Sequence, residues 1–557
     1  MSGFSLTPLH ITNGTILDGS GAPAYPADLL VIGGRIVDII PPSSSMVEGR
    51  VPAGAATLDA SGLVISPGFI DIHSHSDFTL LVDPRAVSAI AQGVTLEVVG
   101  NCGHGCAPIA DPAAVKGNIY GYRAGFELNW TSMAGYLARL DAAQPAVNVL
   151  SLVPNGNLRL AAAGLVDRPS SPDELRKMKR LLDQSLEEGA FGFSTGLEYG
   201  AEQGCAEEEI AELCRVTKAA GGYYATHTRN RAGEAIETIA EPIRASAATG
   251  APLQISHISV VSRLADDGRW AVEQALAQVD AACAQGLDVA FDMHTRLFGT
   301  TNLSAALPPW AVAGTASQIA ARLRDPSVRR ELKSYRSIIT ALARGDWNRI
   351  VLFDSLAQPE LSRRNIHDIS AARGVEPLDA IYDILLAELE APCDGAGDGA
   401  SADSANLHRL MIIAFAYRAE DIRIAFEHPL CMVGSDATAL APDGPLAGTS
   451  FHGAYTWAGW YYRHFVRETR IFKPEEAIRR ITSLPAQRLG LKDRGHIQNG
   501  ARADLAIFDP SDFAERGTTF EPNQTATGMR HVLVNGAFAL RDGALTGHRA
   551  GHVLRHK

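Results

Sequence analysis

Long apolar runs and blocks of like charge are both absent from this 557-residue chain. No stretch approaches the roughly 18 consecutive apolar residues that a membrane span needs, and the start MSGFSLTPLH has neither the basic end nor the apolar run of a secretion signal. The 62 acidic and 50 basic residues are intermixed and give a net charge of −12, which argues against nucleic acid or an anionic membrane as a partner. We therefore expect a cytoplasmic protein.

Cysteine is also scarce. Seven cysteines at irregular spacings form no disulfide framework, so we expect reduced thiols, and a cysteine with a special role should owe that role to its chemistry. The 46% hydrophobic and 20% charged residues are typical of a globular protein, and the length allows more than one core. One large domain and one smaller domain fit this length.

Both ends of the chain alternate apolar and polar residues between turn signals, as short antiparallel strands do. The triplet Ala-Asp-Leu at 27–29 recurs at 503–505, and the Asn-Gly pairs at 13–14 and 535–536 are typical of tight turns. These similarities predict that the two ends join in one small β-sandwich domain, made of residues 1–66 and 485–557.

Between the ends, short apolar runs rich in β-forming residues alternate with helical segments, which is the pattern of parallel strands joined by crossover helices. Eight such units make a closed (β/α)8 barrel, or TIM barrel, the natural topology for residues 67–484. The strands are predicted to end near His73, Val99, Leu152, Ser194, His227, His257, Asp292 and Asp436.

The connection between the seventh and eighth predicted strands is about 140 residues long, far above the usual length. An insertion with a structure of its own is therefore expected at about 297–425. Within it, CDGAGDGASADSAN at 393–406 has little apolar surface to bury and is predicted to be a flexible loop.

Side chains that bind metals follow four of the predicted strands. Active sites of this barrel type are built at the carboxyl ends of the strands, so these side chains should meet at one mouth. A His-Ser-His sequence alone is a weak signal, because alternate strand residues share a face and such pairs also occur in metal phosphoesterases. The whole set is far more specific: His73, His75, His227, His257 and Asp436.

Several motifs at these strand ends resemble the amidohydrolase superfamily, and within it the branch of D-aminoacylases and N-acyl-D-amino-acid deacylases. The similarity covers most of the chain. It rests on PGFIDIHSHSD at 67–77, VVGNCG at 98–103, GLEY at 196–199, THTRN at 226–230, QISHIS at 254–259 and GSDA at 434–437. The resemblance implies a zinc-dependent hydrolase of amide carbon–nitrogen bonds other than peptide bonds.

A cysteine distinguishes this branch from relatives in which a carboxylated lysine bridges two metals. Cys102 matches it, and a thiolate is a strong zinc ligand that can bridge two ions. Cys106 lies outside the motif, and we expect a small buried residue there. By resemblance, the tight zinc would be held by Cys102, His227 and His257. A second, weaker position would be lined by His73, His75 and Asp436.

The resemblance implies metal-assisted hydrolysis, in which zinc polarises the amide carbonyl and lowers the pKa of its water toward neutrality, so that hydroxide attacks. Asp436 is the candidate general base. It would take a proton from that water and return it to the departing nitrogen, because an amide anion is a poor leaving group. The alternative role for Asp436 is that of an outer partner to a histidine.

Substrate recognition is where the sequence departs from the branch. Relatives that accept N-acyl-D-amino acids carry a lysine two residues after the sixth-strand histidine and a Tyr-Pro-Tyr segment after the seventh strand, but here Ser259 and the run 294–296 stand at these positions. Arg296 could bind the substrate carboxylate instead, through two hydrogen bonds. Tyr199 matches a family position that contacts substrate, and Arg229 adds a cation near the site. Both arginines could equally pair with local acids.

Other functions remain open at this point. A cyclic-amide hydrolase of the hydantoinase or dihydroorotase kind would have the same barrel, but such relatives use the bridging lysine rather than a cysteine. A phosphoesterase would leave Cys102 and the terminal strands unexplained. A non-catalytic scaffold should have lost metal ligands, and none is missing from this sequence. A small-molecule amide is the expected partner, and a homo-oligomer is compatible with the sequence.

Overall fold

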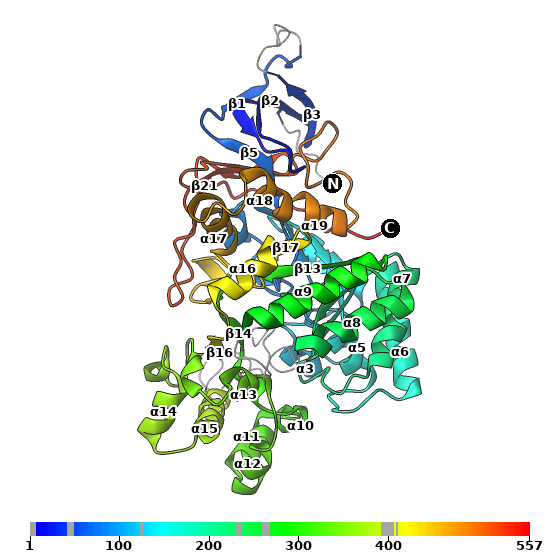
Figure 1. Cartoon of the computed structure of the whole chain (residues 1–557), viewed down its shortest axis with the longest axis vertical. Helices are drawn as coiled ribbons and strands as arrows, with labels where there is room; N and C mark the ends of the chain where they lie inside the picture. The colour runs from blue at the N-terminus through cyan, green and yellow to red at the C-terminus, as the bar shows by residue number, and fades with distance from the viewer. Residues whose placement is uncertain are drawn as a thin grey trace.

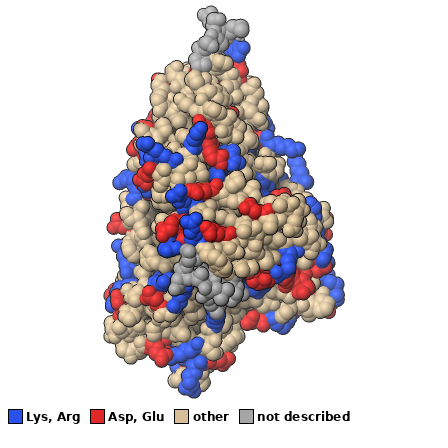
Figure 2. All heavy atoms as spheres, viewed as in Figure 1, with Lys and Arg blue, Asp and Glu red and all other residues tan. Residues whose placement is uncertain are grey.

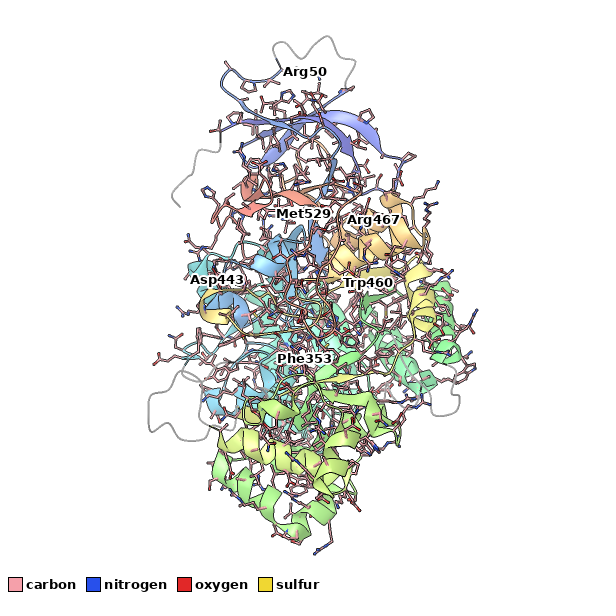
Figure 3. The ribbon with its side chains drawn as sticks, turned by 90° about the vertical axis from the view of Figure 1, so that its left-hand side faces the viewer. Arg50, Phe353, Asp443, Trp460, Arg467 and Met529 are labelled. Carbon is pink, nitrogen blue, oxygen red and sulfur yellow. The ribbon has the colours of Figure 1, made fainter. Side chains whose placement is uncertain are left out.

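The computed structural model describes residues 7–41, 50–122, 126–229, 235–258, 268–391, 406–407 and 410–557. Three parts follow one another along the longest axis: a sheet from the chain ends at the top of Figure 1, the barrel in the middle and an insertion at the bottom. Figure 3, turned by 90°, shows the same order. Acidic and basic side chains are intermixed over the face seen in Figure 2. Among the described residues, no helix is both long and apolar enough to cross a membrane.

Strands from both chain ends pair into one nine-stranded sheet in the order β21-β20-β19-β18-β5-β1-β2-β3, with β4 paired to β1. The two ends join where β5 pairs antiparallel with β18, which places Ile65 opposite Ile507. Both side chains belong to one buried apolar cluster that the sheet encloses. The strands are β1 (Leu9–Ile16), β2 (Tyr25–Ile32), β3 (Arg35–Ile40), β4 (Ala56–Asp59), β5 (Val64–Pro67), β18 (Leu505–Phe508), β19 (Met529–Val534), β20 (Ala537–Arg541) and β21 (Ala544–Leu545).

The two Asn-Gly pairs of this sheet differ in structure. Asn535 and Gly536 form the two-residue turn between β19 and β20, with φ of 50° and 84°, as predicted. Asn13 and Gly14 lie inside β1 instead, where its register against β2 shifts, so the turn predicted at 13–14 is wrong. Asn13 has a φ of 61°, and the left-handed preference of asparagine serves a β-bulge here as it serves a turn elsewhere.

Eight parallel strands close the predicted TIM barrel, the third of them in two pieces, because β8 pairs with β7 and β9 with β10. The first and eighth strands meet in a bridge between Ser74 and Ala437, and the backbone N–H of His75 donates to the Ala437 carbonyl at 2.8 Å. The barrel strands are β6 (Phe69–Asp71), β7 (Val94–Val99), β8 (Asn148–Ser151), β9 (Val153–Pro154), β10 (Gly192–Gly196), β11 (Tyr223–His227), β12 (Leu253–Ile255), β13 (Val289–His294) and β17 (Cys431–Gly434).

Helices cover the outside of the barrel (Figure 1). In α6 (Pro172–Glu187), a capping box of Ser171 and Glu174 starts the helix, and Met178, Leu182 and Leu186 recur every four residues on its buried face. The other long barrel helices are α4 (Met133–Ala143), α5 (Asn155–Ala162), α7 (Glu207–Ala219), α8 (Ala235–Thr249), α9 (Gly268–Ala284), α16 (Ala419–Glu427) and α18 (Pro474–Ile481). Shorter ones are α1 (Thr79–Val82), α2 (Val87–Ile90), α3 (Pro112–Val115), α17 (Trp457–Tyr462) and α19 (Ser483–Arg488).

The insertion between β13 and β17 has an apolar core of its own. Its antiparallel sheet has the order β14-β16-β15, with β14 (Gly299–Asn302), β15 (Ile350–Leu352) and β16 (Met411–Ala414). Its helices are α10 (Pro309–Val312), α11 (Ala316–Arg324), α12 (Pro326–Leu332), α13 (Ile338–Ala343), α14 (Ile366–Arg373) and α15 (Pro377–Glu390). The loop predicted at 393–406 lies almost wholly outside the described residues. Figure 3 shows Phe353 where the insertion meets the barrel, and its ring lies 4.5 Å from that of His452.

Two segments near the predicted boundaries belong to the barrel. The helix α16 packs against α9, so the chain is back on the barrel from Ala419, before the boundary predicted near 425. The last residues also return to it: the backbone N–H of Leu554 donates to Val149 at 2.7 Å and that of His556 to Gly189 at 3.0 Å. The tail thereby covers the amino ends of the barrel strands, opposite the mouth.

Candidate metal centre

Six predicted ligand side chains meet at the carboxyl ends of the barrel strands. Their ligand atoms form two groups, each with all members within 4.8 Å of one another, and Cys102 belongs to both. One group is Cys102, His227 and His257, and the other is His73, His75, Cys102 and Asp436. Residues up to 363 positions apart in the sequence are thus neighbours because the barrel closes between its first and last strands.

The first group has the spacing of a zinc site. The distance is 3.5 Å from Cys102 Sγ to His257 Nε2 and 3.2 Å from His227 Nδ1 to His257 Nε2. A tetrahedral zinc with bonds of about 2.0 Å to nitrogen and 2.3 Å to sulfur separates two nitrogens by about 3.3 Å and sulfur from nitrogen by about 3.5 Å. One sulfur and two nitrogens, all buried, therefore fit this ion in both chemistry and geometry.

The second group adds a carboxylate beside the same sulfur. His73 Nε2 lies 3.2 Å from Cys102 Sγ and 3.6 Å from Asp436 Oδ1, and His75 Nε2 lies 3.3 Å from the same carboxylate oxygen. The Nδ1 atom of His75 is buried and has no hydrogen-bond partner among the residues that the structure describes. Two imidazoles and a carboxylate that share a thiolate with the first group could hold a second cation.

Two carboxylates behind the histidines orient the rings. Asp292, within β13, lies 3.0 Å from His73 Nδ1 and accepts the backbone N–H of His257 at 2.8 Å. Glu198 Oε2 lies 2.9 Å from His227 Nε2. Such outer carboxylates fix the tautomer and raise the basicity of metal-binding imidazoles. The sequence placed Asp292 at a strand end and Glu198 inside GLEY, but neither was predicted to act at the site.

The backbone at three of these positions is left-handed. The φ angles are 52° at Cys102, 35° at His257 and 44° at Asp436. Non-glycine residues rarely adopt this region, and when the fold enforces it they tend to cluster at functional sites. Cys102 lies three residues beyond β7, and His257 and Asp436 lie two residues beyond β12 and β17, so the left-handed backbone occurs where the chain leaves each strand at the mouth.

The charges of the site favour a thiolate and a carboxylate. Burial alone would raise the pKa of Cys102, but the neighbouring His73 and His257 hold that pKa well below its ordinary value. Burial would also raise the pKa of Asp436, yet Arg296 and His75 hold it well below the usual range. At Cys106, burial raises the pKa well above its ordinary value, as expected for a buried structural thiol.

The structure gives Arg296 a place behind Asp436. Its Nη2 lies 2.6 Å from Asp436 Oδ2, and its Nη1 donates at 2.7 Å to the carbonyls of Ser435 and His452. Arg296 does not line the cavity at the mouth, whereas His294, two residues earlier, does. These contacts favour pairing with a local acid over the carboxylate-binding role considered from the sequence. Within the run 294–296, only Arg296 was expected to contact the substrate, so the place of His294 in the cavity was not predicted.

The remaining predicted substrate residues differ in where the structure places them. Tyr199 lines the cavity, with its hydroxyl 3.5 Å from His227 Nδ1. Arg229 pairs with Glu241 at 3.1 Å and donates to the carbonyls of Gln203 and Cys205, away from the mouth. Ser259 lies outside the described residues. Another cavity residue that the sequence missed is Tyr120, whose ring lies 4.6 Å from that of His75.

Comparisons with known proteins agree with this architecture. The model of the amidohydrolase family Amidohydro_3 matches residues 56–332 and 426–539. The N-acyl-D-glutamate deacylase of Alcaligenes xylosoxydans xylosoxydans is 32% identical over 98% of this chain and 96% of its own, and the D-aminoacylase of that organism is 32% identical over 98% and 97%.

A solved structure extends the comparison to three dimensions. N-acyl-D-glutamate deacylase from Bordetella bronchiseptica, complexed with zinc and a phosphonate mimic of the tetrahedral intermediate, aligns with a TM-score of 0.78 at 31% identity, covering 99% of this chain and 100% of that one. Sequence, fold and site geometry agree: the protein belongs to the amidohydrolase family, in the branch of D-aminoacylases and N-acyl-D-amino-acid deacylases.

Proposed function

We propose that the protein is a zinc-dependent deacylase that hydrolyses the amide bond of N-acyl-D-amino acids. The observation that carries this proposal is the zinc-like spacing of Cys102, His227 and His257 beside the carboxylate of Asp436. Relatives that match nearly the whole chain are deacylases of this kind. The partner is then a small-molecule amide.

We assign the tight zinc to Cys102, His227 and His257, and a weaker second position to His73, His75 and Asp436. Bound zinc would polarise the scissile carbonyl and lower the pKa of water at the site. Asp292 and Glu198 would hold His73 and His227 in the orientation that binding needs.

Proton transfer falls to Asp436. Its carboxylate lies in the cavity lining and is held ionised by Arg296, so it can accept a proton from the attacking water. It then returns that proton to the departing nitrogen, since an amide anion leaves poorly. Tyr199, whose hydroxyl faces the same cavity, is suited to hold an oxygen of the substrate.

A panel of amides tests this function. We expect hydrolysis of N-acetyl-D-amino acids, weaker hydrolysis of their L-forms and of neutral amides, and none of hydantoin or dihydroorotate. Preferential opening of the cyclic amides would replace the proposal by a hydantoinase-like activity. No hydrolysis of any amide by protein that retains its zinc would favour a scaffold.

A further inference from the structure

The turn that carries Cys102, made of residues 100–103 and called the Cys102 turn below, is held by a serine of another strand. Among the described residues, neither ligand group of the metal centre includes a residue of β10, the fourth barrel strand. Ser194 of β10 nevertheless contacts the Cys102 turn and is fully buried. Its hydroxyl oxygen accepts the backbone N–H of Gly103 at 3.2 Å, and the same hydroxyl donates to the carbonyl of Gly100. One hydroxyl thus joins the two ends of the turn.

The Cys102 turn reaches β10 by crossing the end of the third strand. Leu152 lies at the break between β8 and β9, and its backbone N–H donates to Val99 at 2.9 Å. A Cβ atom on Gly100 would lie 2.4 Å from the Leu152 carbonyl oxygen, and one on Gly196, the last residue of β10, would lie 2.0 Å from that of Cys102. The two glycines therefore let the turn pack directly against the backbone of both strands.

Two buried asparagines hold the turn and the segment after it from the other side. The side-chain amide of Asn118 donates to the Gly103 carbonyl and to Asn157 Oδ1, each at 2.8 Å. The amide of Asn157 in turn donates to the carbonyls of Gly105 and Pro108, each at 3.0 Å. Side chains therefore satisfy backbone groups that no strand or helix pairs here.

These contacts explain how Cys102 keeps its unusual backbone. A non-glycine residue with a φ of 52° persists only where its surroundings enforce that conformation. Loss of the Ser194 hydroxyl would leave a buried N–H and a buried carbonyl without that partner, which is costly. All the groups that hold the turn belong to the protein, so they act whether or not a metal is bound.

We propose that Ser194, together with Asn118, is a positioning residue of the zinc site, which holds the Cys102 turn so that the thiolate faces His227 and His257. The proposal rests on the proposed function and adds residues that are not among the described ligand groups or the described cavity lining. Residues that orient a metal ligand typically contribute about 10- to 100-fold to metal affinity.

The test removes this hydroxyl and measures zinc retention and the metal–sulfur bond. We expect Ser194→Ala to bind zinc about 10- to 100-fold more weakly than the wild type, as measured by competition between the zinc-loaded protein and a chelator of known affinity. In cobalt-substituted protein, the thiolate-to-cobalt absorption band should be weaker or shifted, because the sulfur is no longer held in place. A residue that only stabilised the fold would leave this band unchanged.

Ser246→Ala is the matched control. It also removes a buried hydroxyl, one that donates to the Ala251 carbonyl at 2.7 Å beside α8, away from the Cys102 turn. It should lower the midpoint of thermal unfolding but leave zinc affinity and the cobalt band as in the wild type.

Two results would overturn the proposal: wild-type zinc affinity in folded Ser194→Ala, or an equal loss of affinity in Ser246→Ala. If Ser194→Ala does not fold, Asn118→Ala, which releases the Gly103 carbonyl on the other side of the turn, is judged by the same measurements. A wild type that binds no zinc would refute the proposed function itself, whereas a wild type that binds zinc no better than folded Ser194→Ala refutes only the role of Ser194.

Discussion

At the residue scale, the carboxylate of Asp436 is proposed to act first as general base and then as general acid. Asp436→Asn keeps the shape of the side chain but removes its ability to accept a proton at neutral pH. General base and acid catalysis are both lost, so kcat should fall by about 10⁴-fold, at or beyond the upper end of the usual range. Zinc content, measured by elemental analysis, should be nearly unchanged because Cys102, His227 and His257 remain. A variant that loses zinc together with turnover would make Asp436 mainly a ligand.

Arg296 tests whether the cation serves the substrate or Asp436. Because its guanidinium pairs with Asp436 and lies outside the cavity lining, Arg296→Ala should lower kcat for acidic and neutral amides alike. Loss of one partner from a buried pair should also destabilise the fold by about 3–5 kcal/mol. Steady-state kinetics on both substrate types provide the measurement. A rise in KM confined to carboxylate substrates would restore the role first considered for Arg296.

Glu198 should act through His227 rather than on the substrate. Glu198→Gln keeps the size of the side chain but removes the charge that orients the imidazole, so zinc affinity should fall about 10- to 100-fold. Competition with a chelator of known affinity measures this change. The control is Glu273→Gln, which changes an exposed carboxylate on α9 and should leave the zinc affinity unchanged. An unchanged zinc affinity in Glu198→Gln would show that Glu198 lines the cavity without supporting metal binding by His227.

The sequence predicted the inner part of the site better than its surroundings. His73, His227 and Asp436 could be predicted because a barrel brings the ends of its strands together wherever they stand in the chain. Asp292 and Arg296 were harder, since their roles depend on which way a side chain points within one turn of backbone. That direction is set by packing between segments distant in sequence, and local pattern does not specify it.

At the scale of elements, the pattern of short apolar runs predicted all eight barrel strands. The hairpin at Asn535-Gly536 followed from the same local rules, whereas Asn13-Gly14 became a bulge because β1 continues through it to pair with β2. The insertion was predicted from its length alone. Its internal structure was not predicted. The antiparallel sheet pairs β14 with β16, which lie more than a hundred residues apart, and no local sequence pattern indicates such a pairing.

The C-terminal tail is an element whose removal gives a clear expectation. Deleting residues 551–557 breaks its backbone hydrogen bonds to Val149 and Gly189 and exposes the apolar surface under Leu554. We expect a lower midpoint of thermal unfolding, by several degrees, with kcat per folded molecule retained because the mouth lies at the other end of the barrel. Deleting Lys557 alone should change neither quantity. An unchanged midpoint after the longer deletion would show that the tail does not contribute to stability.

At the scale of the whole molecule, the barrel lies between the end sheet and the insertion, as Figures 1 and 3 show. The insertion supplies Ile338 and Leu342 to the cavity, whereas no residue of the end sheet is among the described lining. We therefore expect the insertion to influence substrate specificity and the end sheet to influence the stability of the barrel. Changes in the insertion should alter which amides are accepted, and changes in the end sheet should alter how well the barrel is held.

The central claim is that the protein binds zinc at the barrel mouth through Cys102, and a comparison of two cysteines tests it most directly. Zinc content and hydrolysis of N-acetyl-D-leucine should be measured in parallel for the wild type, Cys102→Ala and Cys106→Ala. Both cysteines are buried, but only Cys102 lies within reach of His227 and His257. The account predicts that Cys102→Ala loses most of its zinc and its activity while Cys106→Ala keeps both. A Cys102→Ala protein that retains zinc and turnover would contradict it.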